Sequence, residues 1–144
     1  MNQEFKQCLE NKKIIPFEHA SKLVTKELSV ALNDFSDAKA GYENKRYKWS
    51  TIQAYYAMFH AARGPVFSKG YREKSHYCLA VALRALFVEE GKLDNQDVRD
   101  FLNAMNLREA ADYEAEFSES GPKAVINAAE RFIEKAKFIL QVKG

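Results

Sequence analysis

The regular spacing of apolar residues between Ala20 and Tyr42 constrains the fold of this chain most strongly. Successive apolar positions are separated by steps of four and three residues, which is the spacing of one face of a long helix. Polar residues, Glu27 among them, take the opposite face. The predicted buried face consists of Val24, Leu28, Ala31, Phe35, Ala38 and Tyr42. A chain with such a segment is expected to be helical.

Four further segments show the same spacing, so the chain is predicted to form an all-α, up-and-down bundle of about five helices. The second helix begins near Trp49 and is expected to stop or kink near Arg63. The reason is the following Gly64-Pro65 pair, because proline lacks a backbone donor and disfavours helical geometry at the preceding residue. No segment alternates in the manner of a strand, so no sheet is expected.

The ends of the later helices carry local signals. Ser75 is predicted to cap the third helix and Gly91 to end it, since these residue types suit those positions. Asp94 or Asn95 is expected to cap the fourth helix. The last helix should begin at about residue 123, just after Pro122, which favours a first turn.

A chain of 144 residues has the usual size of one domain, so 1–144 is predicted to be a single domain with residues 1–17 as an appendage. Cys8 and Cys78 lack CxxC spacing and a secretory context, and are expected to be buried or incidental thiols rather than a bridge. Because neither a signal peptide nor an apolar stretch long enough to span a bilayer is found, we expect a cytoplasmic protein without membrane contact.

The usual enzyme signatures are absent. The sequence contains no Walker loop, GxGxxG, HExxH, paired CxxC or GxSxG, and no metal or cofactor is therefore expected. The net charge of +2 does not indicate a nucleic-acid binder by itself, so any RNA contact must come from a local patch.

Three motifs together resemble the HEPN domain family: AYYAMFHAAR at residues 54–63, Lys74-Ser75-His76, and Arg108 followed by Ala111-Asp112-Tyr113. The likeness covers roughly residues 20–140. This resemblance implies a bundle of about five helices, frequent homodimerisation and pairing with a minimal nucleotidyltransferase in toxin–antitoxin systems.

The resemblance also implies a location for the site. In ribonuclease members of the family, an arginine, four to six intervening residues and a histidine form the active motif. Arg72 and His76, the catalytic candidates here, are separated by only three residues, which favours binding over cleavage. An imidazole that titrates near neutrality could move a ribose proton, and guanidinium could hold a phosphate. The predicted nucleotide- or RNA-binding residues are Arg72, Lys74, Ser75, His76 and Arg108.

Structural interpretations compete with these functional ones. Arg63, Asp112 and Tyr113 are predicted to form a buried polar network, in which Arg108 also takes part, because a buried guanidinium needs a carboxylate or carbonyl partner. His76 could simply pack or cap beside Ser75. Other polar or aromatic residues that are expected to serve packing or an interface are His60, Trp49, Tyr55, Tyr56 and Phe59.

Three functions fit these patterns. The first choice is a nucleotide- or RNA-binding component of a toxin–antitoxin-like HEPN/nucleotidyltransferase module. The alternatives are an active, metal-independent HEPN endoribonuclease toxin and a non-catalytic dimerisation scaffold. The expected partners are a second copy of the chain, a minimal nucleotidyltransferase, and RNA or a nucleotide.

Overall fold

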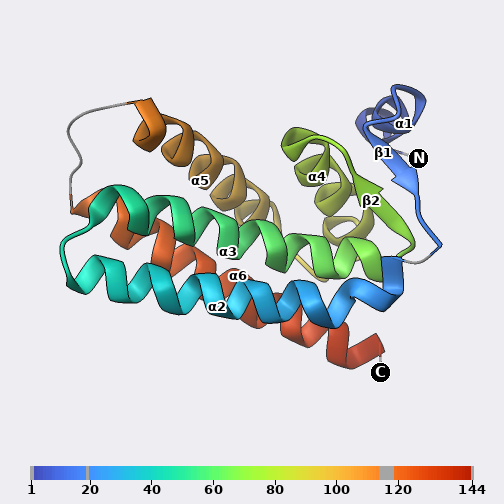
Figure 1. Ribbon diagram of the computed structural model, residues 1–144. Helices are drawn as coiled ribbons and strands as arrows, with labels where there is room; N and C mark the ends of the chain where they lie inside the picture. Colours follow the sequence, from blue (N-terminus) through green and yellow to red (C-terminus); the bar gives the residue numbers. More distant parts are fainter. Residues whose placement is uncertain (1, 19, 114–118, 144) are drawn as a thin grey trace.

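The computed structural model describes residues 2–18, 20–113 and 119–143, without the side chains of 113, 142 and 143. Figure 1 shows that the long helices alternate in direction along the chain, as predicted for an up-and-down bundle. The helices are α1 Gln3–Glu10, α2 Val24–Glu43, α3 Tyr47–Ser68, α4 His76–Leu83, α5 Asn95–Tyr113 and α6 Ser120–Lys143. Five of them, α2 to α6, form the bundle, and α1 packs on it. The predicted all-α class is confirmed.

Helix α3 lies at the centre and contacts α2, α5 and α6. Its buried positions combine small residues, which let neighbouring helices approach closely, with large ones such as Tyr55 and Phe67, both fully buried. At Gly64 an added Cβ would lie 3.5 Å from a methyl group of Leu140 and 3.8 Å from the carbonyl oxygen of Val24. Close packing of this kind, together with a few kcal/mol from each large apolar side chain, holds the bundle together.

The prediction that this helix stops or kinks near Arg63 was wrong, because α3 continues through Pro65 to Ser68. The residue before the proline is a glycine, which has no Cβ to clash with the proline ring. Gly64, Pro65, Val66 and Phe67 are all buried, and their packing offsets the hydrogen bond that proline cannot donate. Tertiary contacts therefore override the local signal here.

The predicted caps at Ser75 and Asp94 are confirmed, whereas the third helix ends at Val88, before Gly91, and the last helix begins at Ser120 rather than near residue 123. The Ser75 hydroxyl accepts a hydrogen bond from the backbone N–H of Cys78 at 3.0 Å. Gly91 has a φ of +76°, a conformation that favours glycine, beyond a π-helical turn at Arg84–Val88. Asp94 and Asp97 each accept a hydrogen bond from the other's backbone N–H at the start of α5.

The buried face of α2 differs from the prediction. Ala31 and Ala38 are buried as expected, but Phe35 is only half-buried, whereas Glu27 is 9% exposed and points into the bundle. Glu27 lies four residues before Ala31 and thus shares its face. Polarity alone predicts that the Glu27 carboxylate is exposed. Its burial depends on cationic partners that only the folded chain brings close to it.

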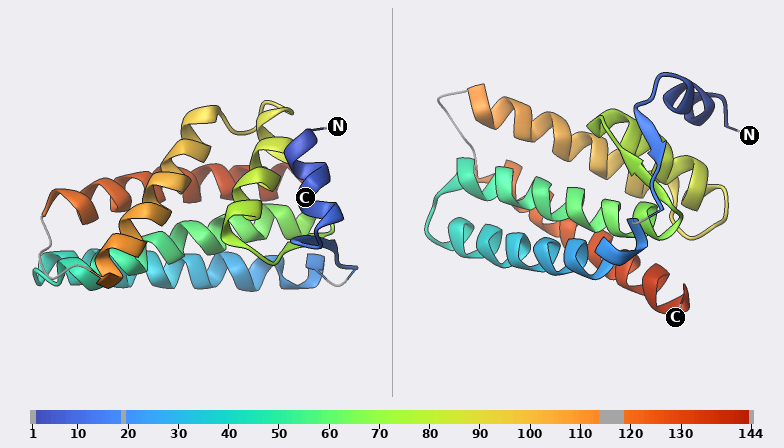
Figure 2. Two further views of the ribbon diagram at one scale, coloured as in Figure 1. Left: turned by 90° about the horizontal axis from the view of Figure 1, so that it is seen from above. Right: turned by 45° about the vertical axis from the view of Figure 1, so that its right-hand side comes forward.

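The N-terminal segment is held to the bundle by two unpredicted features. Strand β1, Ile14–Pro16, pairs antiparallel with β2, Tyr71–Glu73, so the expected absence of strands was wrong. A disulfide joins Cys8 of α1 to Cys78 of α4, and the prediction of two unbridged cysteines was also wrong. Figure 2 shows α1 beside α4. A separation of 70 residues leaves no local signal for such a pairing.

Among the described residues, no helix combines the length and apolar character that crossing a membrane requires.

Candidate functional site

His76 is the first residue of α4 and lies on an aromatic surface of α3. Ser75 caps this helix, so the backbone at its start is well defined. The Nδ1 atom of His76 is 2.6 Å from the hydroxyl oxygen of Tyr55, and its ring centroid is 4.4 Å from that of Phe59. These contacts determine how the imidazole is oriented.

Arg108 reaches the same aromatic surface from α5. Its guanidinium carbon lies 5.6 Å from the ring centroid of Tyr55 and 5.9 Å from that of Tyr56, within the range of cation–π attraction. One terminal nitrogen pairs with Asp112, one helical turn later, at 3.1 Å. The Nε atom is buried and has no acceptor among the described residues. The Arg108 side chain as a whole is 21% exposed, so the guanidinium can also donate to an acceptor that arrives from solvent.

We call this group of residues, Tyr55, Tyr56, Phe59, His76 and Arg108, the His76–Arg108 site. Burial, followed by the positive charges of Arg108 and Arg63, lowers the pKa of His76 below its ordinary value. Burial raises the pKa of Tyr55, so its hydroxyl stays protonated. A protonated hydroxyl can donate to Nδ1 of a neutral imidazole, which leaves the proton of that imidazole on Nε2.

Of the other predicted binding residues, Ser75 caps α4, while Arg72 and Lys74 have their contacts elsewhere. Arg72 is in β2, opposite Ile15, and its guanidinium carbon is 5.5 Å from the ring centroid of Phe17. Lys74 is exposed, and its backbone N–H donates to the carbonyl oxygen of Lys13. Within the described part of the chain, no hydrogen bond or ring contact joins the side chain of Arg72 or Lys74 to His76. The structure therefore brings together His76 and Arg108, which the sequence separates by 32 positions.

The predicted polar network divides into two. Arg63 pairs with Glu27 at 2.9 Å and with Glu73 at 3.1 Å, while Asp112 pairs with Arg108. The side chain of Tyr113 lies outside the described residues, as does His19, for which no function was expected.

His60 belongs to the Arg63 half of this network, since its Nδ1 bonds to Glu27 and its Nε2 lies 3.9 Å from Asp34. Over the described residues, no three His, Cys, Asp or Glu side chains are grouped so as to hold a metal ion.

Sequence reasoning missed Tyr55 as the partner of His76, and Glu27 and Glu73 as the partners of Arg63. A signal existed for Glu27, because it is spaced four residues from Ala31 on the buried face. None existed for the contact between Tyr55 and His76, which depends on how α4 packs against α3.

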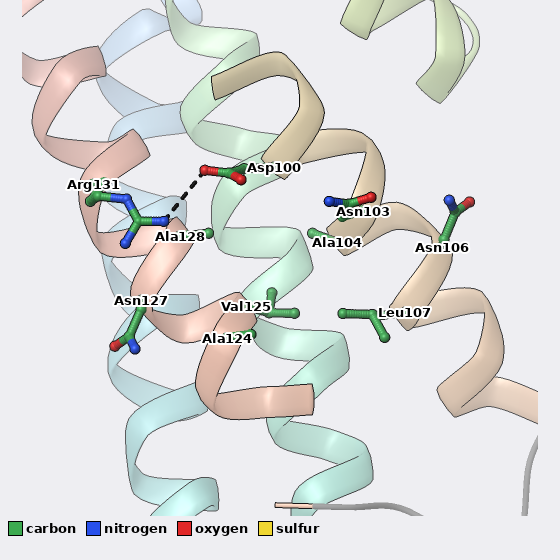
Figure 3. A pocket seen from close by; sticks show the side chains of 10 residues that line it. All are labelled: Asp100, Asn103, Ala104, Asn106, Leu107, Ala124, Val125, Asn127, Ala128 and Arg131. Atoms are coloured by element: carbon green, nitrogen blue, oxygen red, sulfur yellow. Dashed lines mark hydrogen bonds and ion pairs between the residues drawn. The ribbon is translucent and has the colours of Figure 1, made fainter. Parts of the chain in front are cut away.

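A hollow of about 550 Å³ lies between α5 and α6 (Figure 3). An ion pair of 3.4 Å between Asp100 and Arg131 closes one side, and Asn103, Asn106 and Asn127 line the walls. It contains none of the residues nominated from the sequence, so we place the candidate site at His76 and Arg108.

The fold and the site define a small helical-bundle protein in which a histidine at the start of α4 and an arginine of α5 lie on the same aromatic surface of α3. The family model described as "HEPN domain" matches residues 25–143 of the chain. The chain therefore belongs to the HEPN domain family, as its motifs predicted. The chain is 31% identical to "Putative toxin MJ0605" of Methanocaldococcus jannaschii over 115 residues, which are 79% of this chain and 86% of that protein. It is 34% identical to a "UPF0332 protein" of Archaeoglobus fulgidus over 103 residues, or 70% and 82% of the two chains.

Proposed function

We propose that this chain is a toxin-like HEPN protein that binds the phosphate of RNA or of a nucleotide at the His76–Arg108 site. The observation that carries the proposal is the Arg108 guanidinium, which is stacked on two tyrosines and has a buried Nε without an acceptor. The name of the Methanocaldococcus relative supports a toxin-like role.

The chemistry of both side chains suits a phosphate. Guanidinium offers several donors in a planar fork that matches two phosphate oxygens. An imidazole with its proton on Nε2 adds a further donor. Arg108 and His76 contact the same Tyr55 ring, so one anion could accept from both.

Binding is favoured over cleavage because of the contact between His76 and Tyr55. A general base needs a free lone pair, and the lone pair on Nδ1 is occupied when the Tyr55 hydroxyl donates to it. In addition, the guanidinium of Arg72 lies over the ring of Phe17.

The second candidate function is a metal-independent endoribonuclease. It is supported by the lowered pKa of His76, which keeps a neutral imidazole beside a guanidinium at physiological pH.

Substitution of Arg108 tests the proposal. Arg108→Ala should weaken the binding of 5′-UMP and of a short RNA at least about tenfold, as expected for loss of a charge-assisted contact. Arg99→Ala is the matched control, since Arg99 is an exposed arginine on the same helix whose side chain donates to Gln96. Isothermal titration calorimetry measures both. Equal affinities of the two variants would exclude the site.

The ribonuclease alternative has its own assay. Cleavage of labelled RNA by the wild-type protein in the presence of a chelator, lost in His76→Ala, would replace binding with catalysis as the function.

Two partners belong to the same proposal and follow from family membership. Two copies of the chain are expected to associate, which light scattering detects as a mass near twice 16.5 kDa. A minimal nucleotidyltransferase is expected to be encoded by the adjacent gene and to co-purify with this protein.

A further inference from the structure

One stripe of α3 is open to solvent at its N-terminal end and contacts α2 at its other end, where His60 bonds to Glu27. Trp49, Gln53, Tyr56 and His60 follow one another at steps of four, three and four residues and therefore share a face. Trp49 is 55% exposed and the other three are half-buried, whereas most of the rest of the helix is buried. An indole left this open is available for an additional contact.

Three cationic side chains surround Trp49. Lys45 and Arg46 precede α3 and are exposed, and the Nζ atom of Lys48 lies 5.3 Å from the centroid of the Trp49 ring. Together with Tyr47 they line a hollow in the surface. Among the described residues, none of the three cations forms an ion pair. Because the net charge of the whole chain is only +2, this positive patch is a local feature.

The stripe connects this patch to the His76–Arg108 site. Tyr56 lies seven residues after Trp49, about 10 Å along the helix axis. The guanidinium of Arg108 lies over the Tyr56 ring. In Figure 1 the C-terminal half of α5, which carries Arg108, lies above the N-terminal half of α3. A flexible polyanion could therefore contact both places at once.

We infer that this stripe of α3 binds single-stranded RNA, with a base stacked on Trp49 and phosphates paired with Lys45, Arg46 and Lys48. The strand continues past Tyr56 to Arg108, and this second half of the path rests on the function proposed above. Exposed aromatic rings interleaved with cations are the usual means of holding single strands, whose bases are free to stack.

Charge also distinguishes RNA from a second copy of the chain. In a two-fold dimer formed through this patch, the three cations of one protomer would face those of its partner, and their repulsion would oppose association. An RNA backbone supplies the complementary charge.

The only tryptophan of the chain reports directly on this contact. Titration of the intact protein with an eight-residue oligouridylate should quench Trp49 fluorescence, and the affinity should fall as salt rises. A double-stranded RNA of equal length should quench it much less, because its bases are already stacked.

Variants measured by the anisotropy of a labelled oligouridylate complete the test. Trp49→Ala should weaken binding at least about fivefold, the lower end expected for the loss of one stacked base. Phe138→Ala is the matched control, because Phe138 is an aromatic residue on α6 that is 66% exposed and far along the chain from the patch. Lys48→Glu should weaken binding and reduce its salt dependence.

The outcomes separate this inference from the proposed function. If Arg108→Ala abolishes UMP binding while Trp49→Ala leaves oligouridylate binding unchanged, RNA binding by the stripe is refuted and the His76–Arg108 site is supported. If Trp49→Ala weakens oligouridylate binding while Arg108→Ala leaves UMP and oligouridylate binding unchanged, RNA binding by the patch at Trp49 is supported and the His76–Arg108 site is refuted. A third outcome would overturn the inference. If Trp49 is already shielded from solvent without RNA and becomes exposed when dilution dissociates a dimer, the face binds a second copy of the chain.

Discussion

Replacing Arg63 by methionine tests how the interior of this protein is stabilised. The Arg63 side chain is 14% exposed and bridges two carboxylates, Glu27 on α2 and Glu73 on β2, whose side chains are 11% and 8% exposed. Methionine keeps an unbranched apolar side chain and removes the guanidinium, which lies over the rings of Phe59 and Phe67. Both carboxylates then remain buried without their guanidinium partner.

The expected loss in the free energy of unfolding is about 3 to 5 kcal/mol at pH 7, the usual effect of removing one member of a buried ion pair. The total free energy of unfolding of a folded domain is roughly 5 to 15 kcal/mol, so the loss is a large fraction of the stability. Arg99→Met, at an exposed position, should cost no more than about 0.5 kcal/mol.

The deficit should also depend on pH in a defined direction. Burial raises the pKa of Glu73, and the charge of Arg63 acts against that rise. Without Arg63 the pKa should rise further. A carboxyl whose pKa is higher in the folded state holds more protons there, so stability falls as pH increases from its ordinary pKa through the raised one. The loss in Arg63→Met should therefore shrink as the pH is lowered from 7 towards 4.5.

Urea unfolding followed by circular dichroism at pH 7 and pH 5 measures both effects. Adding Glu73→Gln to Arg63→Met should restore part of the lost stability, because one uncompensated charge is removed. A deficit below about 1 kcal/mol, or one of equal size at both pH values, would refute the claim that this network contributes to stability through charge.

Phe59→Ala should lower the free energy of unfolding by about 3 to 5 kcal/mol, and Phe35→Ala by less than half of that, because Phe35 is only half-buried. Equal losses in urea unfolding would contradict the burial described here. His76 should titrate below its ordinary pKa by NMR, and since a lowered histidine pKa removes stability as pH falls through that range, His76→Gln should flatten this part of the stability profile. Reducing the disulfide between Cys8 and Cys78, which are 70 residues apart, should lower stability by about 4 kcal/mol, and Cys78→Ser should lower the Tm to the same degree with or without reductant. An unchanged Tm on reduction would show that the bridge does not stabilise the fold.

Local chemistry was sufficient for much of the fold. Apolar spacing predicted the helices, and Ser75 and Asp94 marked helix starts correctly, because a cap forms between residues only a few positions apart. The family likewise followed from short motifs spread over the chain.

Features that depend on distant residues could not be predicted in this way. Pro65 was expected to end α3, yet burial of the surrounding residues keeps the helix intact. Glu27 was expected to be exposed in spite of its spacing from Ala31, because the cation that offsets its burial, Arg63, comes from another helix. Pairing of β1 with β2 joins two three-residue segments that are too short to show alternation.

The candidate site divides along the same line. The sequence alone determined that the chain folds as a HEPN-type bundle and nominated His76 and Arg108 among several polar residues. Only the tertiary structure placed these two on one aromatic surface and moved Arg72 away to Phe17. Side-chain partners across a bundle depend on the rotation and packing of whole helices, and sequence periodicity specifies the buried face of a helix without specifying which residues of another helix it meets.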